Sequence, residues 1–400
     1  MVNKEVDILI IGGGLTGATL VLALQGLGYN TLLVDAEPLE HKINPDFDAR
    51  SLALSPSSKR ILSMLEVWTY VQEYATPIEL IHVSEQHHFG TSRLHGTQEK
   101  PLGYVVEMQY LNRALYQLLP THQILAPAIL KSIDLETTVV TLTTDTGEIK
   151  VKAQLIVAAD GAHSTARRCC GLPSKTKIYL QNAIVANIGL SKPHAGRAYE
   201  RFTAHGPLAL LPMQEQRMSL VWAMPPKNAQ QIMSLSDEEF LQKLQQAFGY
   251  RLGRFVKTGK RTSFPLQQVL MPQQVKGAMV FIGNAAHTLH PVAGQGFNLG
   301  LRDVATLAQC IAKQGLNREM LRHYIQLRAD DQKIITYFTD GLIQLFTSRL
   351  PGLGHVRGLG LMALDNIPVL KKLLTRYARG FGGVVPDLVC EIALQESRRA

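Results

Sequence analysis

The sequence predicts an α/β protein in which a Rossmann-like dinucleotide-binding domain carries an inserted, mainly antiparallel β-sheet and is followed by a helical C-terminal region. Three observations support this prediction. A strand–glycine turn–helix–strand unit stands at 6–35, strand-like segments follow one another from about 172 to 268, and helical patterns continue from about 298 to 379. Strands that alternate with helices indicate a parallel sheet, whereas successive strands indicate an antiparallel one.

The first unit contains a complete βαβ pattern. The apolar segment 8–11 predicts a buried strand, and GGGLTG at 12–17 matches the spacing G-x-G-x-x-G. A helix is expected to about Leu27, and a second strand at 31–34 ends in Asp35. Strand, glycines, helix, strand and acid therefore occur in the order that a dinucleotide site requires.

Each fixed residue of this unit has a physical role. Gly12 permits the tight turn, Gly14 lets the backbone approach a pyrophosphate, and Gly17 lets helix and strand pack closely. The phosphates would lie on unpaired amides at the positive end of the helix, and Asp35 can accept hydrogen bonds from a ribose. We favour this interpretation over a simple glycine turn or a membrane span, which three consecutive glycines would interrupt.

Composition restricts the class of protein. A chain of 400 residues with 46% hydrophobic content suits two interleaved domains or one large one. The net charge of +9 is spread along the chain, and no basic segment with interleaved aromatic residues predicts nucleic-acid binding. This balance favours an anionic cofactor or an anionic membrane face. The 4 cysteines have neither metal nor disulfide spacing, which indicates a reducing cytoplasm.

Two charged residues stand close to predicted strands of this domain. Arg50 follows the polar loop after the second strand, where a guanidinium could pair with a phosphate or remain solvated; the local sequence leaves both open. Strands are expected at 138–143, 148–153 and 155–159, and the last of these delivers Asp160 and Gly161. Asp160 could be only a helix cap, but an acid at a strand end backed by glycine favours a cofactor role.

The predicted secondary structure changes between about Leu172 and Gln268. Alternating strands surround one helix, Asp237 to Phe248, for which Ser236 is the expected N-cap. An antiparallel sheet here would supply a wall for a substrate. Candidates for its apolar lining are Phe202, Leu210, Met213 and Trp222, although for each one alone an ordinary core position is favoured.

A second constellation, VFIGNAAHTLHPVAGQGFN, stands at 280–298. A strand is expected to end at Gly283 and a helix to begin near Gly296. Gly294 and Gly296 would let backbone amides approach a flat ring, and the helix dipole would stabilise negative charge on it. His287 and His290 have no carboxylate or cysteine partner at a metal-binding spacing, so no metal site is predicted here or at the histidines of 75–106.

The C-terminal region offers one further alternative. Its segment 368–381, PVLKKLLTRYARGF, mixes apolar and cationic residues. It could lie on a membrane surface, but an ordinary amphipathic helix that packs on the body is favoured.

These motifs together resemble a known family. GGGLTG with Asp35, DGAHSTAR at 160–167 and GNAAHTLHPVAGQGFN at 283–298 resemble, in this order, the class A flavoprotein aromatic hydroxylases. AYERFTAHGPLALLPM at 198–213 and FPL at 264–266 look more specifically like the ubiquinone-biosynthesis hydroxylases, closest to the branch that acts on 2-polyprenyl-6-methoxyphenols. The resemblance covers nearly the whole chain.

The resemblance implies FAD as cofactor and NAD(P)H as co-substrate. It implies that the first motif holds the ADP half, that Arg50 lies at the pyrophosphate, and that the last motif flanks the flavin. Asn284 stands where the family at large has an acid, so the charge of that acid is missing here. The implied cofactor-binding residues are Gly12, Gly14, Leu15, Thr16, Gly17, Asp35, Arg50, Asp160, Gly161, Gly283, Asn284, Pro291, Gly294, Gln295, Gly296, Phe297 and Asn298.

The implied reaction hydroxylates a polyprenylated methoxyphenol para to its hydroxyl, with O2 activated as a flavin C4a-hydroperoxide. The flavin carries this chemistry, so catalytic residues stay unassigned, with His287, His290 and Pro291 as weak candidates by motif. The expected location is cytoplasmic, with peripheral contact to the inner face of the cell membrane and assembly with other ubiquinone-synthesis proteins. A sister hydroxylase acting at another ring position, an FAD-dependent prenyl reductase and a non-catalytic scaffold remain as alternatives.

The expected domain division is interleaved. The FAD-binding domain would comprise 1–73, 107–172 and 273–318, the substrate domain 74–106 and 173–272, and the helical C-terminal region 319–400.

Overall fold

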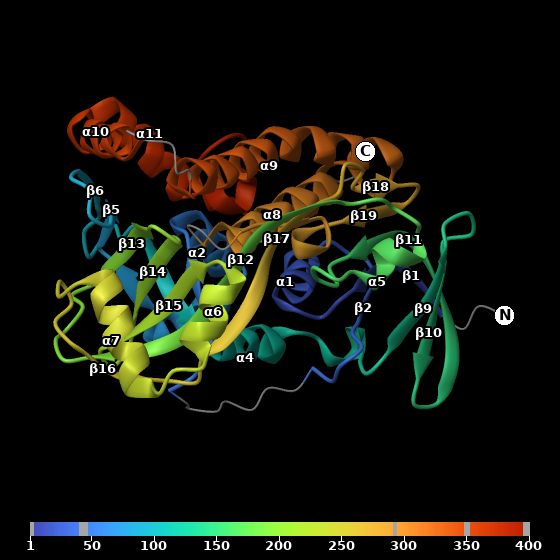
Figure 1. Cartoon of the computed structure of the whole chain (residues 1–400). Coiled ribbons are helices and arrows are strands. Elements are labelled where there is room, and N and C mark those ends of the chain that lie inside the picture. Colours follow the sequence, from blue (N-terminus) through green and yellow to red (C-terminus); the bar gives the residue numbers. More distant parts are fainter. Residues whose placement is uncertain (1–3, 40–46, 291–293, 348–352, 395–400) are drawn as a thin grey trace.

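Three sheets organise the chain in the computed structural model, which describes residues 4–39, 47–290, 294–347 and 353–394 (Figure 1). The first sheet has eight strands. Its main path is β18 (Val275–Lys276), β19 (Met279–Phe281), β11 (Gly147–Ala158), β1 (Lys4–Ile11), β2 (Thr31–Val34) and β8 (Ile124–Leu125). The hairpin of β9 (Ile129–Asp134) and β10 (Val139–Thr144) extends from β11.

The centre of this sheet is parallel and covered on both faces. β19, β11, β1, β2 and β8 run in the same direction. Ile8 and Ile10 pack in the core cluster that also contains helices α1 (Leu15–Leu24) and α8 (Gln295–Gln314), whereas Leu9 and Ile11 face a second cluster. Because both faces are buried, the strand is a continuous apolar segment and not an alternating one.

The second sheet has nine strands and forms the inserted unit. Its path is β20 (His287–Thr288), β17 (Thr262–Leu270), β12 (Lys175–Leu190), β15 (Arg217–Met224), β14 (Gly206–Met213), β13 (Arg197–Thr203), β5 (Leu80–Glu85) and β6 (Thr91–His95), with β16 (Phe255–Thr258) on β12. All pairs are antiparallel except β13 with β5. Helices α6 (Pro226–Met233) and α7 (Asp237–Phe248) cover one face.

The remaining elements link these two sheets. A small third sheet contains β3 (Ser51–Leu54), β7 (Gly103–Glu107) and β4 (Thr76–Ile78). The helices not yet given are α2 (Pro56–Met64), α3 (Val67–Val71), α4 (Met108–Leu118), α5 (Thr165–Cys169), α9 (Arg318–Thr347), α10 (Leu353–Asn366) and α11 (Pro368–Ala378). In Figure 1, α8 and α9 lie across the top of the molecule, with α10 and α11 at one end.

The predicted fold class is confirmed, with local corrections. Helix α1 ends at Leu24 and not near Leu27. The two strands expected over 148–159 are one strand, β11, which continues from the hairpin into the parallel core. The apolar residues Ile61, Leu62, Leu65 and Trp68 have helical spacing, but the chain there forms two helices, α2 and α3, separated at Glu66, whose φ of 62° is left-handed. Ser236 caps α7 as predicted, in a capping box with Glu239.

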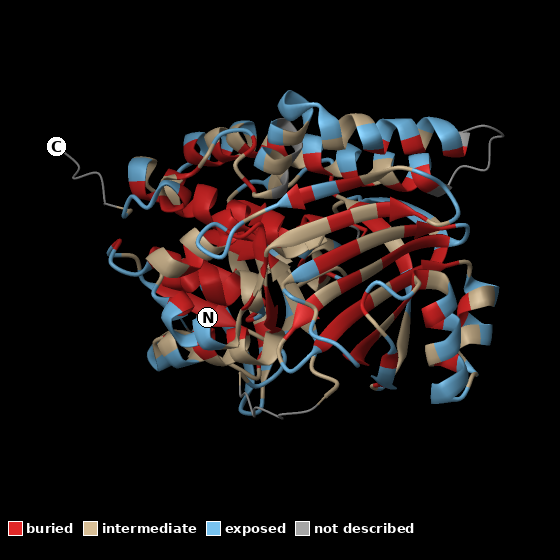
Figure 2. Cartoon of the chain, turned by 90° about the vertical axis from the view of Figure 1, so that its left-hand side faces the viewer, coloured by how far each residue is buried: buried red, intermediate tan, exposed pale blue. Residues whose placement is uncertain are grey.

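Figure 2 shows buried residues in the inner helices and along the strands of the large sheet, whereas the outermost helices carry many exposed residues. None of the helices in the described part of the chain combines the length and the apolar character that crossing a bilayer requires.

Candidate active site

Three turns meet at one edge of the first sheet. β1, β11 and β19 are adjacent and parallel, so their carboxyl ends lie side by side. The turns after these strands contain Gly12, Asp160 and Gly283, and the amide of Ala159 donates to the carbonyl of Ile11 at 2.7 Å. Open α/β sheets bind ligands at this edge. The three motifs that are far apart in the sequence are therefore neighbours.

The glycines of the first turn have the spatial roles that the spacing predicts. A Cβ on Gly17 would lie 1.9 Å from the carbonyl oxygen of Gly12, and one on Gly12, whose φ is +106°, would lie 2.6 Å from Ala159. A Cβ on Gly14 would meet no described atom within 4 Å beyond its own helix and its chain neighbours. Helix α1 begins directly after Gly14 without a side-chain cap. The helix start thus has open space in front of it, as an anion site requires.

Thr16 joins the first turn to the late motif. A Cβ on Gly283, where φ is +57°, would lie 2.9 Å from the Thr16 hydroxyl oxygen, and one on Gly300 would lie 3.3 Å from it. Neighbouring Leu15 packs its side chain on the core of the first sheet. Only small residues at 283 and 300 allow this approach between α1 and α8.

Asp35 stands at the end of β2 and holds the glycine turn. Its Oδ2 accepts a hydrogen bond from the Gly13 amide at 2.5 Å, and its Oδ1 accepts one from the Glu37 amide at 2.8 Å. The Tyr116 hydroxyl donates to the Gly13 carbonyl at 2.9 Å. Burial, followed by the nearby charge of Asp35, raises the pKa of Tyr116 to about 12. A carboxylate has about four acceptor sites, so Asp35 can still receive ribose hydroxyls.

The second turn contains both a cap and an unpaired acceptor. Asp160 Oδ2 accepts from the Ala166 amide at 2.9 Å, so the helix-cap alternative describes a real contact. Its Oδ1 is buried and has no hydrogen-bond partner among the described residues. The adjacent Gly161 has a φ of +81°. The unpaired oxygen keeps the predicted cofactor role open.

Arg167 ties this turn to the late motif. Its guanidinium donates to the carbonyl oxygens of Ala285, at 3.0 Å, and Ala162, at 2.9 Å. The sequence contained this arginine in DGAHSTAR but did not predict its partner, because Ala285 is more than a hundred residues away.

The late motif places its glycines at the start of α8. Gly294 is the N-cap residue with a φ of +59°, and Gly296 has open space where a Cβ would stand. Gln295 is buried, and Phe297 packs on the core of the first sheet. The helix therefore begins one residue earlier than the expected Gly296, while Pro291 lies outside the described residues.

Asn298 and Asn284 have different surroundings. The Asn298 side chain accepts from the Ser55 amide at 2.8 Å and the Ser58 hydroxyl at 2.7 Å, and donates to the carbonyls of Ala53 and Gly294. It thereby fixes the start of α8 against β3 and α2. Asn284 is exposed, so its amide is accessible to a ligand.

Arg50 is exposed at the start of β3. Its guanidinium lies 5.5 Å from the centre of the Phe264 ring, and its backbone carbonyl accepts from the Met108 amide at 2.7 Å. The structure thus places Arg50 between the third sheet and the second sheet, and its phosphate role stays a prediction.

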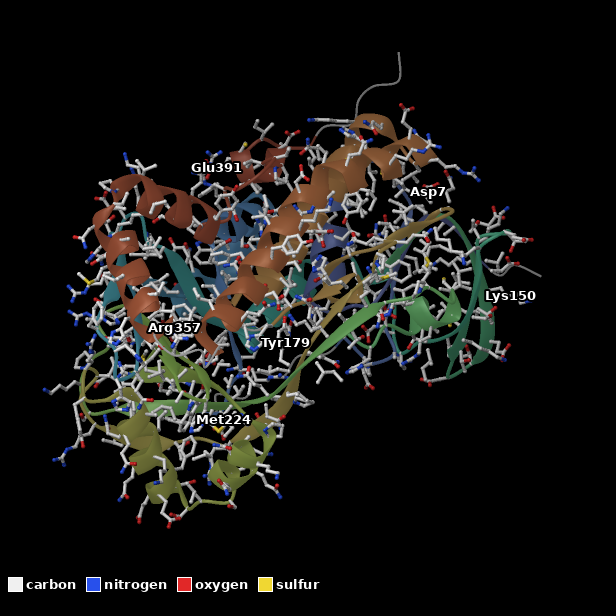
Figure 3. All side chains as sticks on the ribbon, turned by 45° about the horizontal axis from the view of Figure 1, so that its top comes forward. Asp7, Lys150, Tyr179, Met224, Arg357 and Glu391 are labelled. Carbon is white, nitrogen blue, oxygen red and sulfur yellow. The ribbon has the colours of Figure 1, made fainter. Side chains whose placement is uncertain are left out.

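The two histidines of the late motif are buried in different environments. His287 Nε2 lies 2.6 Å from Asp303 Oδ2. His290 makes an edge contact with the Tyr179 ring, with centroids 5.0 Å apart. Burial lowers the pKa of His290 to about 4, with Asp340 opposing the shift, so His290 is neutral near pH 7. Figure 3 shows Tyr179 on β12 close to α9, where its hydroxyl donates to Asp340 at 3.1 Å.

A buried charged cluster behind this loop was missed by the sequence analysis. It consists of His287, Arg302, Asp303, Arg328 and Asp331. Asp303 accepts from the Gly283 amide at 3.0 Å and from Arg328 Nε at 2.8 Å. Arg328 also pairs with Asp331 at 2.5 Å, and Arg302 pairs with Asp331 at 2.8 Å. A signal was present, because Arg302 and Asp303 interrupt an otherwise apolar helical face.

Asp303 stays ionised within this cluster. Burial alone would raise the pKa of its carboxyl, but the charges of His287 and Arg328 and the hydrogen bonds from His287 and Gly283 hold that pKa well below its usual value. The cluster therefore anchors the Gly283 turn from behind with a fixed negative charge. In the described part of the chain, no group of His, Cys, Asp and Glu side chains could hold a metal ion.

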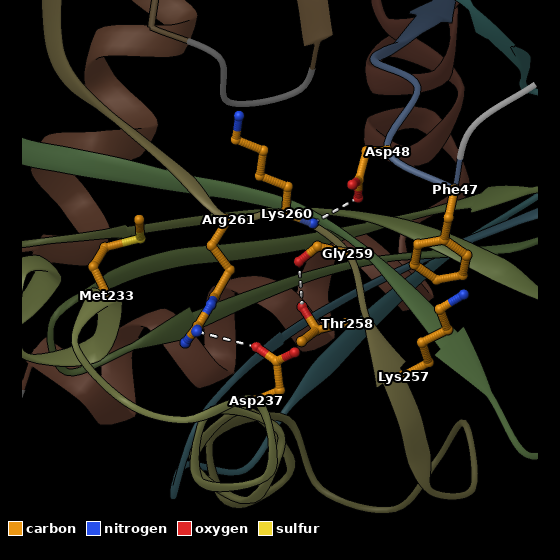
Figure 4. A pocket seen from close by; sticks show the side chains of 9 residues that line it. All are labelled: Phe47, Asp48, Met233, Asp237, Lys257, Thr258, Gly259, Lys260 and Arg261. Atoms are coloured by element: carbon orange, nitrogen blue, oxygen red, sulfur yellow. Dashed lines mark hydrogen bonds and ion pairs between the residues drawn. The ribbon is translucent and has the colours of Figure 1, made fainter. Parts of the chain in front are cut away.

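A hollow of about 490 Å³ lies elsewhere, beside β16 and α7 (Figure 4). Arg261 pairs with Asp237 there at 3.1 Å, and the Lys260 amide donates to Asp48 at 2.6 Å. Its lining is Phe47, Asp48, Met233, Asp237, Lys257, Thr258, Gly259, Lys260 and Arg261, which includes no predicted site residue. This hollow is open and polar, and we do not assign the active site to it.

The edge of the first sheet defines the class of protein. Open space at Gly14 and Gly296, an uncapped helix start and the unpaired oxygen of Asp160 fit a dinucleotide that continues into a flat ring. These features define a dinucleotide-binding protein.

Comparison with known proteins identifies the family. The family model for the FAD binding domain matches residues 5–330, so the chain belongs to that family. A ubiquinone hydroxylase (UbiL) of Rhodospirillum rubrum is 34% identical over 392 residues, covering 94% of this chain and 90% of the relative. The 3-demethoxyubiquinol 3-hydroxylase of Escherichia coli is 31% identical over 392 residues, covering 95% of this chain and 100% of the relative.

Solved structures agree with this fold. The p-nitrophenol 4-monooxygenase PnpA from Pseudomonas putida superposes with a TM-score of 0.77 at 16% identity, covering 95% of this chain and 99% of that one. The chain is accordingly an FAD-dependent monooxygenase of the ubiquinone hydroxylase family, in which NAD(P)H is the usual co-substrate.

Proposed function

We infer that this chain hydroxylates a polyprenylated methoxyphenol, para to its hydroxyl group, in ubiquinone biosynthesis. One observation carries this inference: the turn at Gly283 connects the cofactor edge of the first sheet to the second sheet. Gly283 follows β19, and only four residues later His287 pairs with Leu270 of the second sheet. A flat ring at the start of α8 would therefore lie beside the wall that the second sheet supplies.

Different residues of the chain would bind different parts of the cofactor. Gly14 and the start of α1 would bind the phosphates, Asp35 the ribose, and the backbone from Gly294 to Gly296 the ring. When bound, FAD would carry the reducing equivalents of NAD(P)H and activate the oxygen. The protein supplies orientation and the exclusion of water, and it requires no nucleophile or metal of its own.

The experiment is substrate-stimulated NAD(P)H oxidation by the FAD-loaded protein, with a short-tailed 2-prenyl-6-methoxyphenol as substrate. We expect oxygen uptake to match nicotinamide oxidation, and mass spectrometry to find one added oxygen para to the hydroxyl. A product oxygenated at another position would identify a sister hydroxylase instead.

Two other outcomes would contradict the proposal. Reduced flavin that is stable in air, with hydrogenation of the prenyl tail, would indicate a reductase. FAD binding without any turnover, combined with restored ubiquinone synthesis in deletion cells, would indicate a scaffold.

The proposal includes a peripheral membrane position on the cytoplasmic side, and the exposed surface of the C-terminal helices supports the membrane contact. Exposed apolar side chains on α9, α10 and α11 include Tyr337, Val356, Leu359 and Val369. α11 also carries Lys371, Lys372 and Arg376, which favour an anionic lipid face. Assembly with other proteins of the pathway is a further part of this proposal.

A further inference from the structure

One row of residues on the second sheet keeps accessible surface. Register across β5, β13, β14, β15 and β12 aligns Val83, Glu200, Ala209, Val221 and Val185, here named the central row. This row lies on the face turned away from α6 and α7. All five residues have intermediate exposure, whereas the next row on the same face is buried: Glu85, Phe202, Pro207, Ala223 and Ala183.

Glu200 is the one ionisable residue of the central row. Its Oε1 is buried, and no described residue donates a hydrogen bond to it. Burial alone raises the pKa of the Glu200 carboxyl to about 7, without a contribution from any neighbouring charge among the described residues. The side chain is therefore deep inside the molecule, although part of the residue still borders accessible space.

The neighbouring ionisable groups are already paired. On the same face, Glu85 of β5 pairs with Arg357 of α10 and lies 3.6 Å from His88. On the opposite face, the Arg201 guanidinium donates to the Ala247 carbonyl of α7 and the Ser84 hydroxyl, and Arg251 contacts His82. β14 contributes only Pro207, Ala209 and Leu211 beside Glu200. None of these groups neutralises the Glu200 carboxyl.

The central row extends from Glu200 towards the loop that contains His287 and His290. Val221 and Tyr179 both pack against the cluster of Ala183, Ala223 and Leu266, and the Tyr179 ring contacts His290. Glu200 is two strands from Val221, roughly 10 Å across the sheet. A phenol ring whose hydroxyl lies at Glu200 would therefore extend over Ala209 and direct its para position towards the loop that flanks the cofactor.

A buried hydrogen-bond acceptor without a donor destabilises a protein. Its presence therefore indicates that a bound ligand supplies the donor. We propose that Glu200 binds the phenolic hydroxyl of the substrate and accepts its proton. This assignment rests on the proposed function and adds to it the general base.

The proton transfer is balanced within the complex. The phenolic O–H bond breaks, its proton moves to a Glu200 carboxylate oxygen, and the electron pair stays on the phenolate oxygen. Delocalisation of that pair makes the para carbon more nucleophilic. The proton returns to water when the product leaves. A carboxyl that titrates near pH 7 is suited to this exchange at neutral pH.

The central test is Glu200→Gln in the FAD-loaded protein. We expect flavin content to be unchanged, while substrate hydroxylation falls by about 100- to 10,000-fold. In the native protein, kcat/KM should fall below pH about 7, and this acid limb should disappear in the variant. Glu200→Asp keeps a carboxyl and should restore part of the rate together with the acid limb.

Glu238→Gln is the matched control, because it makes the same chemical change at an exposed position on α7 of the inserted unit. Native-like turnover and an unchanged acid limb in Glu200→Gln would overturn the assignment. If the native protein oxidises no phenol, the proposed function fails as a whole. If it hydroxylates the phenol equally well with glutamine at this position, only the role of Glu200 fails.

Discussion

Gly14 and Gly17 differ in what surrounds them, although both belong to the same fingerprint. A Cβ at Gly17 would lie 1.9 Å from the Gly12 carbonyl oxygen, whereas at Gly14 there is open space. Gly17→Ala should therefore disturb the fold itself. Gly14→Ala should leave the fold intact, because its φ of −64° suits alanine, and should weaken FAD binding where the methyl group meets the pyrophosphate.

The pair is tested by thermal unfolding with and without added FAD. Gly14→Ala should match the native Tm without FAD and lose most of the FAD-induced rise, whereas Gly17→Ala should already unfold at a lower temperature without FAD. Gly341→Ala on α9, where a Cβ also meets no described atom, is the control and should keep the full rise. A full FAD response in Gly14→Ala would show that the phosphates bind elsewhere.

The predictive value of the sequence depended on whether a residue's role was local. The glycine turn was predictable because its constraint lies within one βαβ unit. The side chains that line one face of the second sheet were not predictable, because the face on which a side chain lies depends on the register of the strands. Leu210 and Trp222 pack in the cluster with α7, in agreement with the core positions that were favoured for each of them over a substrate wall. Phe202 and Met213 lie on the opposite face, in smaller clusters with α9 and β7.

At the scale of elements, α8 and α9 are joined by charges buried between them. Arg302 and Asp303 on α8 meet Arg328 and Asp331 on α9, and all four side chains are nearly inaccessible. The sequence predicted both helices but not this pairing. Its partners are about 25 residues apart and on different helices, and a helical pattern alone does not give the rotation of one helix against another.

Asp303→Asn should therefore lower the free energy of unfolding and weaken the attachment of the turn at Gly283. Removing one partner of a buried ion pair leaves Arg328 poorly compensated, which typically costs about 3–5 kcal/mol. The variant should unfold at lower urea concentration and bind FAD more weakly, since Asp303 also accepts from the Gly283 amide. Glu148→Gln, in the exposed pair with Lys131, is the control and should change little. Equal urea midpoints for Asp303→Asn and the control would contradict this role.

The pH dependence of stability follows from the same carboxyl. The pKa of Asp303 is lower in the folded protein than in the unfolded chain. Its contribution to the free energy of unfolding is therefore complete above the unfolded value, about 4, and is lost as the pH falls towards the folded value. The native protein should lose more stability than Asp303→Asn between pH about 4 and pH about 2.

For the whole molecule, the arrangement of sheets places the C-terminal helices on the outside, beyond α9 (Figure 1). The sequence pattern favours packing of the last helix on the body over a membrane face, and the exposed fractions bear on this choice. Val369 is 74% exposed and Leu359 is 58% exposed, although both are aliphatic. Isolated exposed apolar residues are ordinary, but several on adjoining helices beside cations indicate a contact surface.

Membrane contact is testable through charge and apolar area together. The FAD-loaded protein should co-sediment with vesicles that contain anionic lipid, and less so with neutral vesicles or at high salt, because each cation near an anionic surface contributes about 1 kcal/mol. Leu359→Asp combined with Val369→Asp should reduce binding at least tenfold by opposing burial of the apolar groups. Val256→Asp is the matched control, because Val256 is 57% exposed on β16 of the inserted unit. Because none of the substituted residues is a predicted cofactor-binding residue, turnover of a short-tailed phenol in detergent-free solution should stay native in both variants. Equal vesicle binding by the double variant and the control would place the lipid contact on another face.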